Sequence, residues 1–500
     1  METFVSKIDL EDPPGRFEAF HERFSERFKT KTRDVGDKAM DYLLGGLHLD
    51  KKFTITNIPE VVDDTNNQRL HHFISESLWR KEPVIERLQE DASSLIGGED
   101  TALVVDGVSF PKQGEKSVGV ARQWCGNLGK VENCQVGVFL GLATPNGERM
   151  LIDERLCLPE EWVEDKERRE EAGVPEDIEF KTKPEFALEM IKEAKENDVE
   201  FGWVNADSLY DRSSSFRENL DEEDVKYMVD IPMDTKLWLA EEIASQSEID
   251  EPPKRADELE KTLDPNQKKE VEIRETKRGK LESEVTALRV HTNRNDHPSD
   301  KEKWLLIRRD KNKDETKYFL SNAPPETSLH KLVKMSATRY WIERAIEGGK
   351  GEVGMGDYEV RKWRGWHHHM TMTMLAMLLL LEMKIGLGDK CPDLAVQDVR
   401  DILQRTLPKR KVTEDDFRKL LEEKIKRRKS ARKSRHRKNK NSSGGASRAW
   451  TSAPSRAVTW TWCWSMTRRS TNEGKTGSTS LTWLSVTTQK KRNTLSYSPE

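Results

Sequence analysis

Two apolar runs of this chain each end in an aspartate, and a third acid lies in a helical pattern far downstream. Asp106 follows the apolar run 102–105, and Asp207 follows the run 203–206. Glu343 lies in a segment that begins a helical pattern. A carboxylate at the end of a buried element is costly unless a cation compensates its charge. The fold must therefore bring these acids together or give each of them a partner.

Three carboxylates on separate elements can converge on a divalent metal ion without help from histidine or cysteine. All-oxygen donor sets suit Mg²⁺ or Mn²⁺, and phosphoryl transfer to or from nucleic acid is the commonest use of such sites. Each acid also has an ordinary explanation, as a strand-end aspartate that caps a turn or as a glutamate on a helix surface. Only the combination of the three favours a metal site.

The composition indicates a polar, soluble chain that is long enough for two to four domains, since 34% of its 500 residues are hydrophobic and 35% are charged. Its five cysteines show no paired spacing, which argues against zinc sites and for a reducing compartment. The N-terminus has no signal-peptide pattern. The apolar stretch 370–385 is too short to span a bilayer, so we expect a buried helix there and a cytoplasmic protein without a membrane partner.

Positive charge gathers near the C-terminus. Residues 424–443 contain eleven Lys or Arg and no acid. Such a run is typical of a disordered basic tail that attracts DNA without reading its sequence, or of a solubilising tail. The net charge of the chain is −5, so the remainder is strongly acidic, which is unusual for a nucleic-acid binder. Local clusters of basic residues, or an acidic halophile-like proteome, would explain this charge.

The periodicity of apolar residues changes from helical to strand-like near residue 99. Residues 1–98 predict a small helical domain, which either binds DNA or packs as a cap on the neighbouring domain. Residues 99–231 predict the order β-β-β-α-β-α-β, with one acid after the first strand and one after the fourth. This is the order of a ribonuclease-H-like sheet, in which a later helix supplies a third acid. The predicted fold class is therefore α/β.

The second half is less regular. Residues 232–335 predict a β-containing insertion, because a charged stretch precedes strand-like runs. Residues 336–410 complete the core with the third acid, and residues 411–443 form the basic tail. Residues 444–500 contain five tryptophans among Ser, Thr and Arg without periodicity, so we expect them to be disordered or aberrant, as if translated out of frame.

Several motifs resemble those of bacterial and archaeal insertion-sequence transposases of the DDE type. The branch concerned has a Tyr–Arg–Glu–Lys signature around the third acid, and Arg339, Glu343 and Lys350 match it in spacing. Ser336 stands where the tyrosine is expected. The similarity covers roughly residues 16–410 and is specific, because the motifs occur in order. They are Val105-Asp106-Gly107, Phe110-Pro111-Lys112, the runs 119–126 and 158–162, Ala206-Asp207, and the runs 358–361 and 363–369.

The resemblance implies a transposase that cuts transposon ends and joins them to target DNA by a cut-and-paste route. Asp106, Asp207 and Glu343 would be catalytic and would hold two Mg²⁺ (or Mn²⁺) ions, roughly 3.5–4 Å apart. The partners would be double-stranded DNA, as terminal inverted repeats and as target, bound by a homodimer. Ser336 weakens the part of the signature thought to contact phosphates of the transferred strand, but it leaves the metal ligands intact.

Other residues are candidate DNA contacts. Arg339 and Lys350 are expected near the third acid, where cations can hold the scissile phosphates; ion pairs with neighbouring glutamates are the alternative. Lys112 and Lys116 are plausible phosphate contacts, although lysines that follow a strand are usually only solvated. Trp304, in the insertion, would receive a flipped base or pack in the core. The adjacent histidines 367–369 point in different directions on a helix, which favours structural or phosphate-contacting roles over a metal site.

Two other functions stay open on the sequence. One is a different ribonuclease-H-like DNA nuclease, such as a resolvase, which cuts without joining. The other is a catalytically decayed copy that still binds DNA, which Ser336 and the irregular segment 444–500 both favour.

Overall fold

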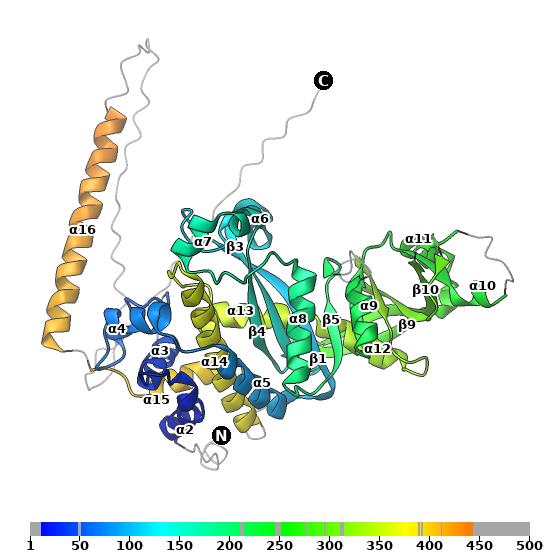
Figure 1. Ribbon diagram of the computed structural model, residues 1–500, viewed down its shortest axis with the longest axis horizontal. Coiled ribbons are helices and arrows are strands. Elements are labelled where there is room, and N and C mark those ends of the chain that lie inside the picture. The colour runs from blue at the N-terminus through cyan, green and yellow to red at the C-terminus, as the bar shows by residue number, and fades with distance from the viewer. Residues whose placement is uncertain are drawn as a thin grey trace, which may run out of the picture. The chain divides into compact units, whose positions relative to one another are not determined.

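The computed structural model describes residues 12–48, 52–210, 215–245, 252–276, 279–294, 297–310, 315–388, 391, 394–411 and 413–443. The chain divides into two compact units, residues 1–413 and 414–500. The first unit is a mixed α/β structure built on one large sheet (Figure 1). The expectation for residues 444–500 lies outside the described residues.

The helices and strands of the first unit alternate in groups along the chain. The helices are α2 (Pro13–Ser25), α3 (Gly36–His48), α4 (Asn67–His71), α5 (Glu82–Ile96), α6 (Glu160–Glu164), α7 (Lys166–Ala172), α8 (Lys183–Glu196), α9 (Ser215–Glu222), α10 (Ala240–Ser245), α11 (Ala256–Thr262), α12 (Leu329–Thr338), α13 (Tyr340–Glu352), α14 (Trp363–Gly388) and α15 (Val396–Thr406). Short helical turns are η1 (Glu26–Phe28), η2 (Ile58–Glu60), η3 (His72–Glu76), η4 (Gly126–Leu128) and η6 (Pro265–Gln267). The strands are β1 (Gly98–Pro111), β2 (Ala121–Cys125), β3 (Lys130–Ala143), β4 (Arg149–Cys157), β5 (Phe201–Ala206), β6 (Tyr227–Ile231), β7 (Lys236–Leu239), β8 (Lys254–Arg255), β9 (Lys269–Thr276), β10 (Gly279–Arg294), β11 (His297–Pro298), β12 (Lys303–Asp310) and β13 (Glu315–Ser321).

Within the described residues, thirteen strands form one sheet whose main path runs β2-β3-β1-β5-β6-β13-β12-β10-β7-β8. Strand β3 is antiparallel to both β1 and β4, whereas β5 is parallel to β1 and β6 is parallel to β5. The expected order of strands and helices between residues 99 and 231 is found, with β2, α6 and α7 in addition. Figure 1 shows α8 alongside this part of the sheet.

Strands β7 to β13 lie between β6 and α12 in the chain and continue the same sheet. The connection is direct, because β13 is antiparallel to β6, with Tyr318 opposite Ile231 and Ser321 opposite Met228. The strand-like runs expected in this region correspond to β12 and β13. The added strands are therefore joined to the sheet by backbone hydrogen bonds and not only by side-chain packing.

Helix α14 is the central helix of the first unit and packs against β4, α3 and α5. A buried helix was expected over residues 370–385, and burial is confirmed. The expected length was wrong, because α14 has 26 residues and is long enough to cross a membrane by length and composition. However, 72% of its most apolar window is buried inside the protein, as in the core helix of a soluble protein.

The three histidines at the start of α14 have structural partners. His367 Nδ1 lies 2.8 Å from Glu154 Oε1, and His369 Nδ1 lies 2.8 Å from the Tyr42 hydroxyl. His368 is held between two backbone carbonyls, of residues 74 and 79, at 2.9 and 3.0 Å. These contacts connect α14 to the N-terminal helices and to β4.

The second unit is described only over α16 (Glu414–Ser443). The expectation of a disordered tail over residues 424–440 was wrong, because the helix continues through this basic run. Lys and Arg have favourable helix propensities, and the run contains no proline or glycine to stop the helix.

Candidate active site

Two of the predicted acids lie side by side on neighbouring strands. Strand β5 is parallel to β1, and Val104 pairs with Asn205. Asp106 and Asp207 each lie two residues further on, so they share one level and one face of the sheet. Neighbouring strands are about 4.8 Å apart, which brings the carboxylates close together.

Asp106 was expected at the end of its strand, and this expectation was wrong. Strand β1 continues to Pro111, because Val108 and Phe110 extend the buried pattern beyond the acid. Asp207, by contrast, directly follows β5 as expected. Asp106 is therefore held within a paired strand, where its backbone is fixed by the partner β3.

A third aspartate extends the row and was missed by the sequence analysis. Ala206 pairs with Val229 of the parallel strand β6, so Asp230 lies next to Asp207. We call Asp106, Asp207 and Asp230 the aspartate row. The signal was present in the sequence, because Asp230 also sits near the end of an apolar strand.

Glu343 reaches the row from α13, on the same face of the sheet. Gly141 of β3 is opposite Val104 and so shares that face. A Cβ atom at Gly141 would lie only 2.5 Å from Ile342 Cδ1, so the end of the Ile342 side chain occupies the space next to this glycine. The close approach places Glu343 over the strands that carry the row.

The Arg339 guanidinium connects the row to Glu343. Its Nε lies 3.2 Å from Asp230 Oδ2, and its Nη2 lies 3.4 Å from Glu343 Oε1. Burial alone would lower the pKa of Arg339, but the carboxylates around it raise that pKa. Those carboxylates are Asp230, Asp106, Glu343 and Asp207, in decreasing order of effect.

The environment of the row disfavours the charged forms of Asp106 and Asp230. Burial raises the pKa of Asp106 to about 6, and the negative charge of Asp207 adds to this shift. The Arg339 charge and a hydrogen bond from the Gly107 N–H, at 2.7 Å, act in the opposite direction. Burial also raises the pKa of Asp230, again against the effect of Arg339. Additional positive charge at this place would therefore be favourable.

The donor set fits a hard divalent cation in its chemistry, since it consists of partly buried carboxylate oxygens. In the part of the chain that the structure describes, however, no three His, Cys, Asp or Glu side chains are gathered closely enough to hold a metal ion. The Arg339 guanidinium lies against Asp230 and Glu343.

The raised pKa of Asp106 predicts a pH-dependent stability. Between its ordinary value of 3.8 and about 6, the folded protein keeps a proton on Asp106 that the unfolded chain has lost. Ionisation therefore destabilises the fold as pH rises through this window. In EDTA, the melting temperature of Asp106→Asn minus that of wild type should increase from pH 4 to pH 7. A difference that is constant over this range would contradict the shift.

The predicted DNA contacts near Glu343 are Arg339 and Lys350. Arg339 forms the ion pair with Glu343 that the sequence analysis gave as the alternative. Lys350 lies further along α13, with its Nζ 5.2 Å from the centre of the Phe110 ring. Burial lowers the pKa of Lys350, while Asp106 is one of the groups that oppose this effect. The structure thus places Arg339 in contact with the acids, whereas Lys350 lies near Phe110 and interacts with Asp106 through its charge.

The other three candidates lie apart from the acids. Lys112 donates to the Tyr358 carbonyl at 3.2 Å and lies over the Tyr358 ring, and burial lowers its pKa to about 8. Lys116 is exposed and pairs with Glu171 at 3.3 Å. Trp304, in β12, donates its indole N–H to the Pro324 carbonyl at 3.1 Å. This hydrogen bond fixes the position of the ring.

Ser336 has a defined partner of its own. It is buried in α12, donates to the Val333 carbonyl at 2.8 Å and accepts from Arg308 Nη1 at 2.7 Å. Arg308, which the sequence analysis also missed, comes from β12. The departure from the tyrosine signature therefore coincides with an arginine that approaches the same region from the added strands.

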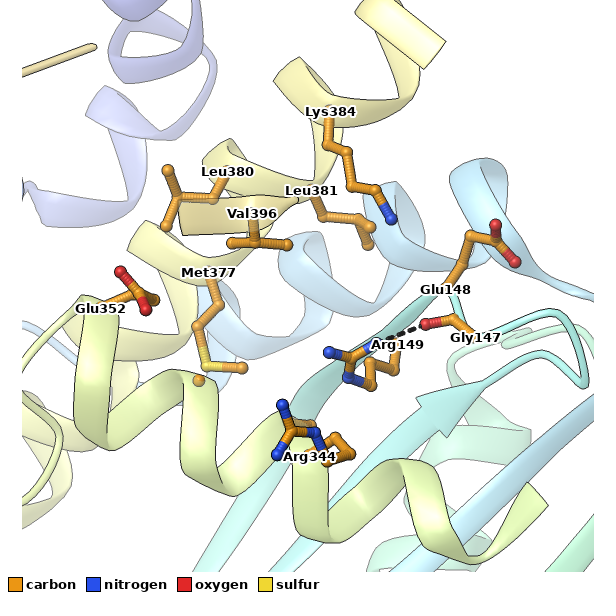
Figure 2. Close-up of a pocket in the computed structure, with 12 residues that line it drawn as sticks. Gly147, Glu148, Arg149, Arg344, Glu352, Met377, Leu380, Leu381, Lys384 and Val396 are labelled. Atoms are coloured by element: carbon orange, nitrogen blue, oxygen red, sulfur yellow. Dashed lines mark hydrogen bonds between the residues drawn. The ribbon is translucent and has the colours of Figure 1, made fainter. Parts of the chain in front are cut away.

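A small cavity lies on another face of α13 and is separate from the acids (Figure 2). Its wall includes Arg149, Arg344 and Glu352 together with Met377 and the aliphatic part of α14. Figure 2 shows the hydrogen bond that Arg149 donates to the Gly147 carbonyl, at 2.7 Å. With a volume of about 50 Å³, this cavity is too small for a nucleotide.

Known proteins resemble this chain in sequence and, more weakly, in structure. The probable transposase for insertion sequence element IS701 from Microchaete diplosiphon is 27% identical over 349 residues, covering 68% of this chain and 82% of that protein. A cryo-EM structure of the piggyBac transposase synaptic complex with hairpin DNA gives a TM-score of 0.37 at 11% identity, covering 82% of this chain and 88% of that one. A crystal structure of the NurA nuclease from Sulfolobus solfataricus gives a TM-score of 0.24 at 8% identity, covering 53% of this chain and 85% of that one. TM-scores below 0.5 do not establish a common fold.

The family assignment comes from the sequence. The DDE superfamily endonuclease family matches residues 23–293, which include Asp106, Asp207 and Asp230. Enzymes of this family use divalent metal ions, in agreement with the chemistry of the aspartate row. Because the match covers more than half of its residues, this chain belongs to the DDE superfamily of endonucleases, as a DDE-type insertion-sequence transposase.

Proposed function

We propose that this transposase cuts the DNA ends of its own element in a metal-dependent reaction and joins the freed 3′ ends to target DNA. The observation that carries the proposal is the placement of Asp106 and Asp207 at one level of the sheet with Glu343 above them, in a chain of the DDE family. Its partners would be terminal inverted repeats and target DNA, bound by a homodimer in the cytoplasm.

We propose a ribonuclease-H-like core for this chemistry. The path β4-β3-β1-β5-β6, with β3 antiparallel and β5 parallel to β1, supports this assignment. The corresponding division is a helical domain over 1–98, a core over 99–231 and 336–410, an insertion over 232–335 and a basic segment over 411–443. Helices α2 to α5, strands β7 to β13 and helix α16 are consistent with these boundaries.

The proposed roles are based on the positions of the side chains. Asp106, Asp207 and Glu343 would hold two divalent ions, Mg²⁺ or Mn²⁺. Ions bound there would activate the attacking hydroxyl and stabilise the departing 3′ oxygen. Arg339 and Lys350, at the same acids, would bind phosphates of the reacting strand.

The remaining three candidates would act at a distance from the acids. Lys116 is exposed and free to reach flanking DNA phosphates once it leaves Glu171. Lys112 and Trp304 would have to give up their carbonyl partners to contact DNA, so we propose only secondary roles for them.

A strand-transfer assay tests the joining step. The probe is a duplex of the element's end with a labelled 3′-hydroxyl, incubated with supercoiled target plasmid in Mg²⁺, in Mn²⁺ or in EDTA. We expect metal-dependent joined products that are absent with Asp207→Asn. Cutting of a plasmid-borne end without joining would favour a nuclease that only cleaves. Binding of the end with neither cutting nor joining would favour a decayed copy.

A further inference from the structure

Asp230 is the member of the aspartate row that the family signature does not assign. It contacts Arg339 through Nε at 3.2 Å, while Glu343 contacts the same guanidinium through Nη2 at 3.4 Å. The two carboxylates therefore hold different nitrogens of one planar group. Such a contact at two points fixes the orientation of a guanidinium as well as its position.

The two carboxylates that contact Arg339 differ in their exposure to solvent. The side chains of Asp230 and Arg339 are each 17% exposed, whereas the Glu343 side chain is 52% exposed. An exposed ion pair is screened by water and has to immobilise a long side chain, so it contributes little to the free energy that holds the guanidinium in place. Asp230 also sits on a paired strand, whereas Glu343 lies on the half-exposed first turn of α13. Asp230 is therefore the principal anchor of Arg339.

Other cations near Asp230 are held differently. Arg308 and Lys317 both favour the charged form of Asp230 and come from β12 and β13. Arg308 is hydrogen-bonded to Ser336 Oγ. Within the contacts that the structure describes, Arg339 alone bridges Asp230 to one of the proposed metal ligands.

We propose that Asp230 is a positioning residue, which anchors the Arg339 guanidinium at the β6 end of the row and so keeps it out of the space between Asp106, Asp207 and Glu343. This inference rests on the proposed function, since it takes those three carboxylates as the metal ligands. Without the anchor, the guanidinium is attracted to the acids that remain charged. It then competes with a divalent ion for the same oxygens.

The test is a calorimetric titration with Mn²⁺ alone, without DNA, on the full chain. The variants are Asp230→Asn, Arg339→Gln and the double variant, with Asp221→Asn as the matched control. Asp221 is also a partly buried aspartate in an ion pair, with Lys303 at 2.7 Å. We expect Asp230→Asn to weaken Mn²⁺ binding about tenfold and the control to bind like wild type. The double variant should bind like Arg339→Gln, because no competing guanidinium is left.

The outcomes separate the possible roles of Asp230. If Asp230→Asn weakens Mn²⁺ binding tenfold both in the wild-type background and in the Arg339→Gln background, Asp230 is a metal ligand and the positioning role is overturned. Unchanged Mn²⁺ binding by Asp230→Asn, in a variant that melts like wild type, would overturn it too. If Asp106→Asn abolishes Mn²⁺ binding while Asp230→Asn does not affect it, only this inference fails. If wild type binds no Mn²⁺, the proposed function fails together with it.

Discussion

Asp207→Asn should lower the rate of DNA-end cleavage by more than about a thousandfold, which corresponds to roughly 4 kcal/mol of lost transition-state stabilisation. The change keeps the shape of the side chain but removes the negative charge that would hold the metal ions. Binding of the element's end should stay within about twofold of wild type, because DNA affinity depends mainly on cationic contacts to phosphates. Single-turnover cleavage of an end-labelled duplex measures the first effect, and a filter-binding titration measures the second.

The same result is expected for Asp106→Asn and Glu343→Gln. Asp221→Asn is the control for removing an aspartate charge elsewhere on the protein, and it should cleave normally. If any of the three variants cleaved within about tenfold of wild type, a loss of roughly 1.4 kcal/mol, that residue would not be a metal ligand. The three positions can therefore be accepted or rejected one at a time.

Lys81→Met should lower the free energy of unfolding by about 3 kcal/mol at pH 7. The Lys81 ammonium lies 2.8 Å from Glu154 Oε1, and the Glu154 side chain is completely buried. Removing the ammonium leaves this carboxylate with His367 as its side-chain partner, and burial lowers the pKa of His367, which opposes a compensating positive charge. Urea denaturation at pH 7 measures the loss.

The double variant Lys81→Met/Glu154→Gln is the control for this prediction. It removes both charges, so most of the lost stability should return, because the cost comes from an unpaired buried charge and not from a missing contact. A loss below about 1 kcal/mol in Lys81→Met alone would show that water or His367 compensates Glu154 fully.

Part of the site could be predicted from the sequence because its signal is local. A short apolar run followed by an aspartate predicted Asp106 and Asp207, and the resemblance to the family signature selected Arg339, Glu343 and Lys350. Arg339 lies at the N-terminal end of α13, and the other two lie within it. Asp230 carries the same local signal as the first two aspartates. Its significance depends on the register between β5 and β6, which no local pattern contains.

The remaining features depend on contacts between distant parts of the chain. His368 is buried between two backbone carbonyl oxygens that come almost three hundred residues earlier in the chain, and nothing in the histidine run indicates these partners. The extent of α14 was underestimated because its first two turns contain Arg364, Gly365 and the three histidines and so interrupt the apolar pattern. The strand-like runs of the insertion were recognised, but their attachment to β6 was not.

The pairing of β6 with β13 has a consequence for synthesis of the protein. A ribosome produces β6 long before β13, so the β6 edge stays without its partner while the intervening strands are made. An unpaired strand edge beside apolar neighbours is a template for aggregation. We expect gene copies interrupted between these two strands to yield insoluble chains, whereas interruptions after β13 leave that edge covered. Survival of soluble fragments from decaying copies of the element should therefore depend sharply on where the reading frame breaks.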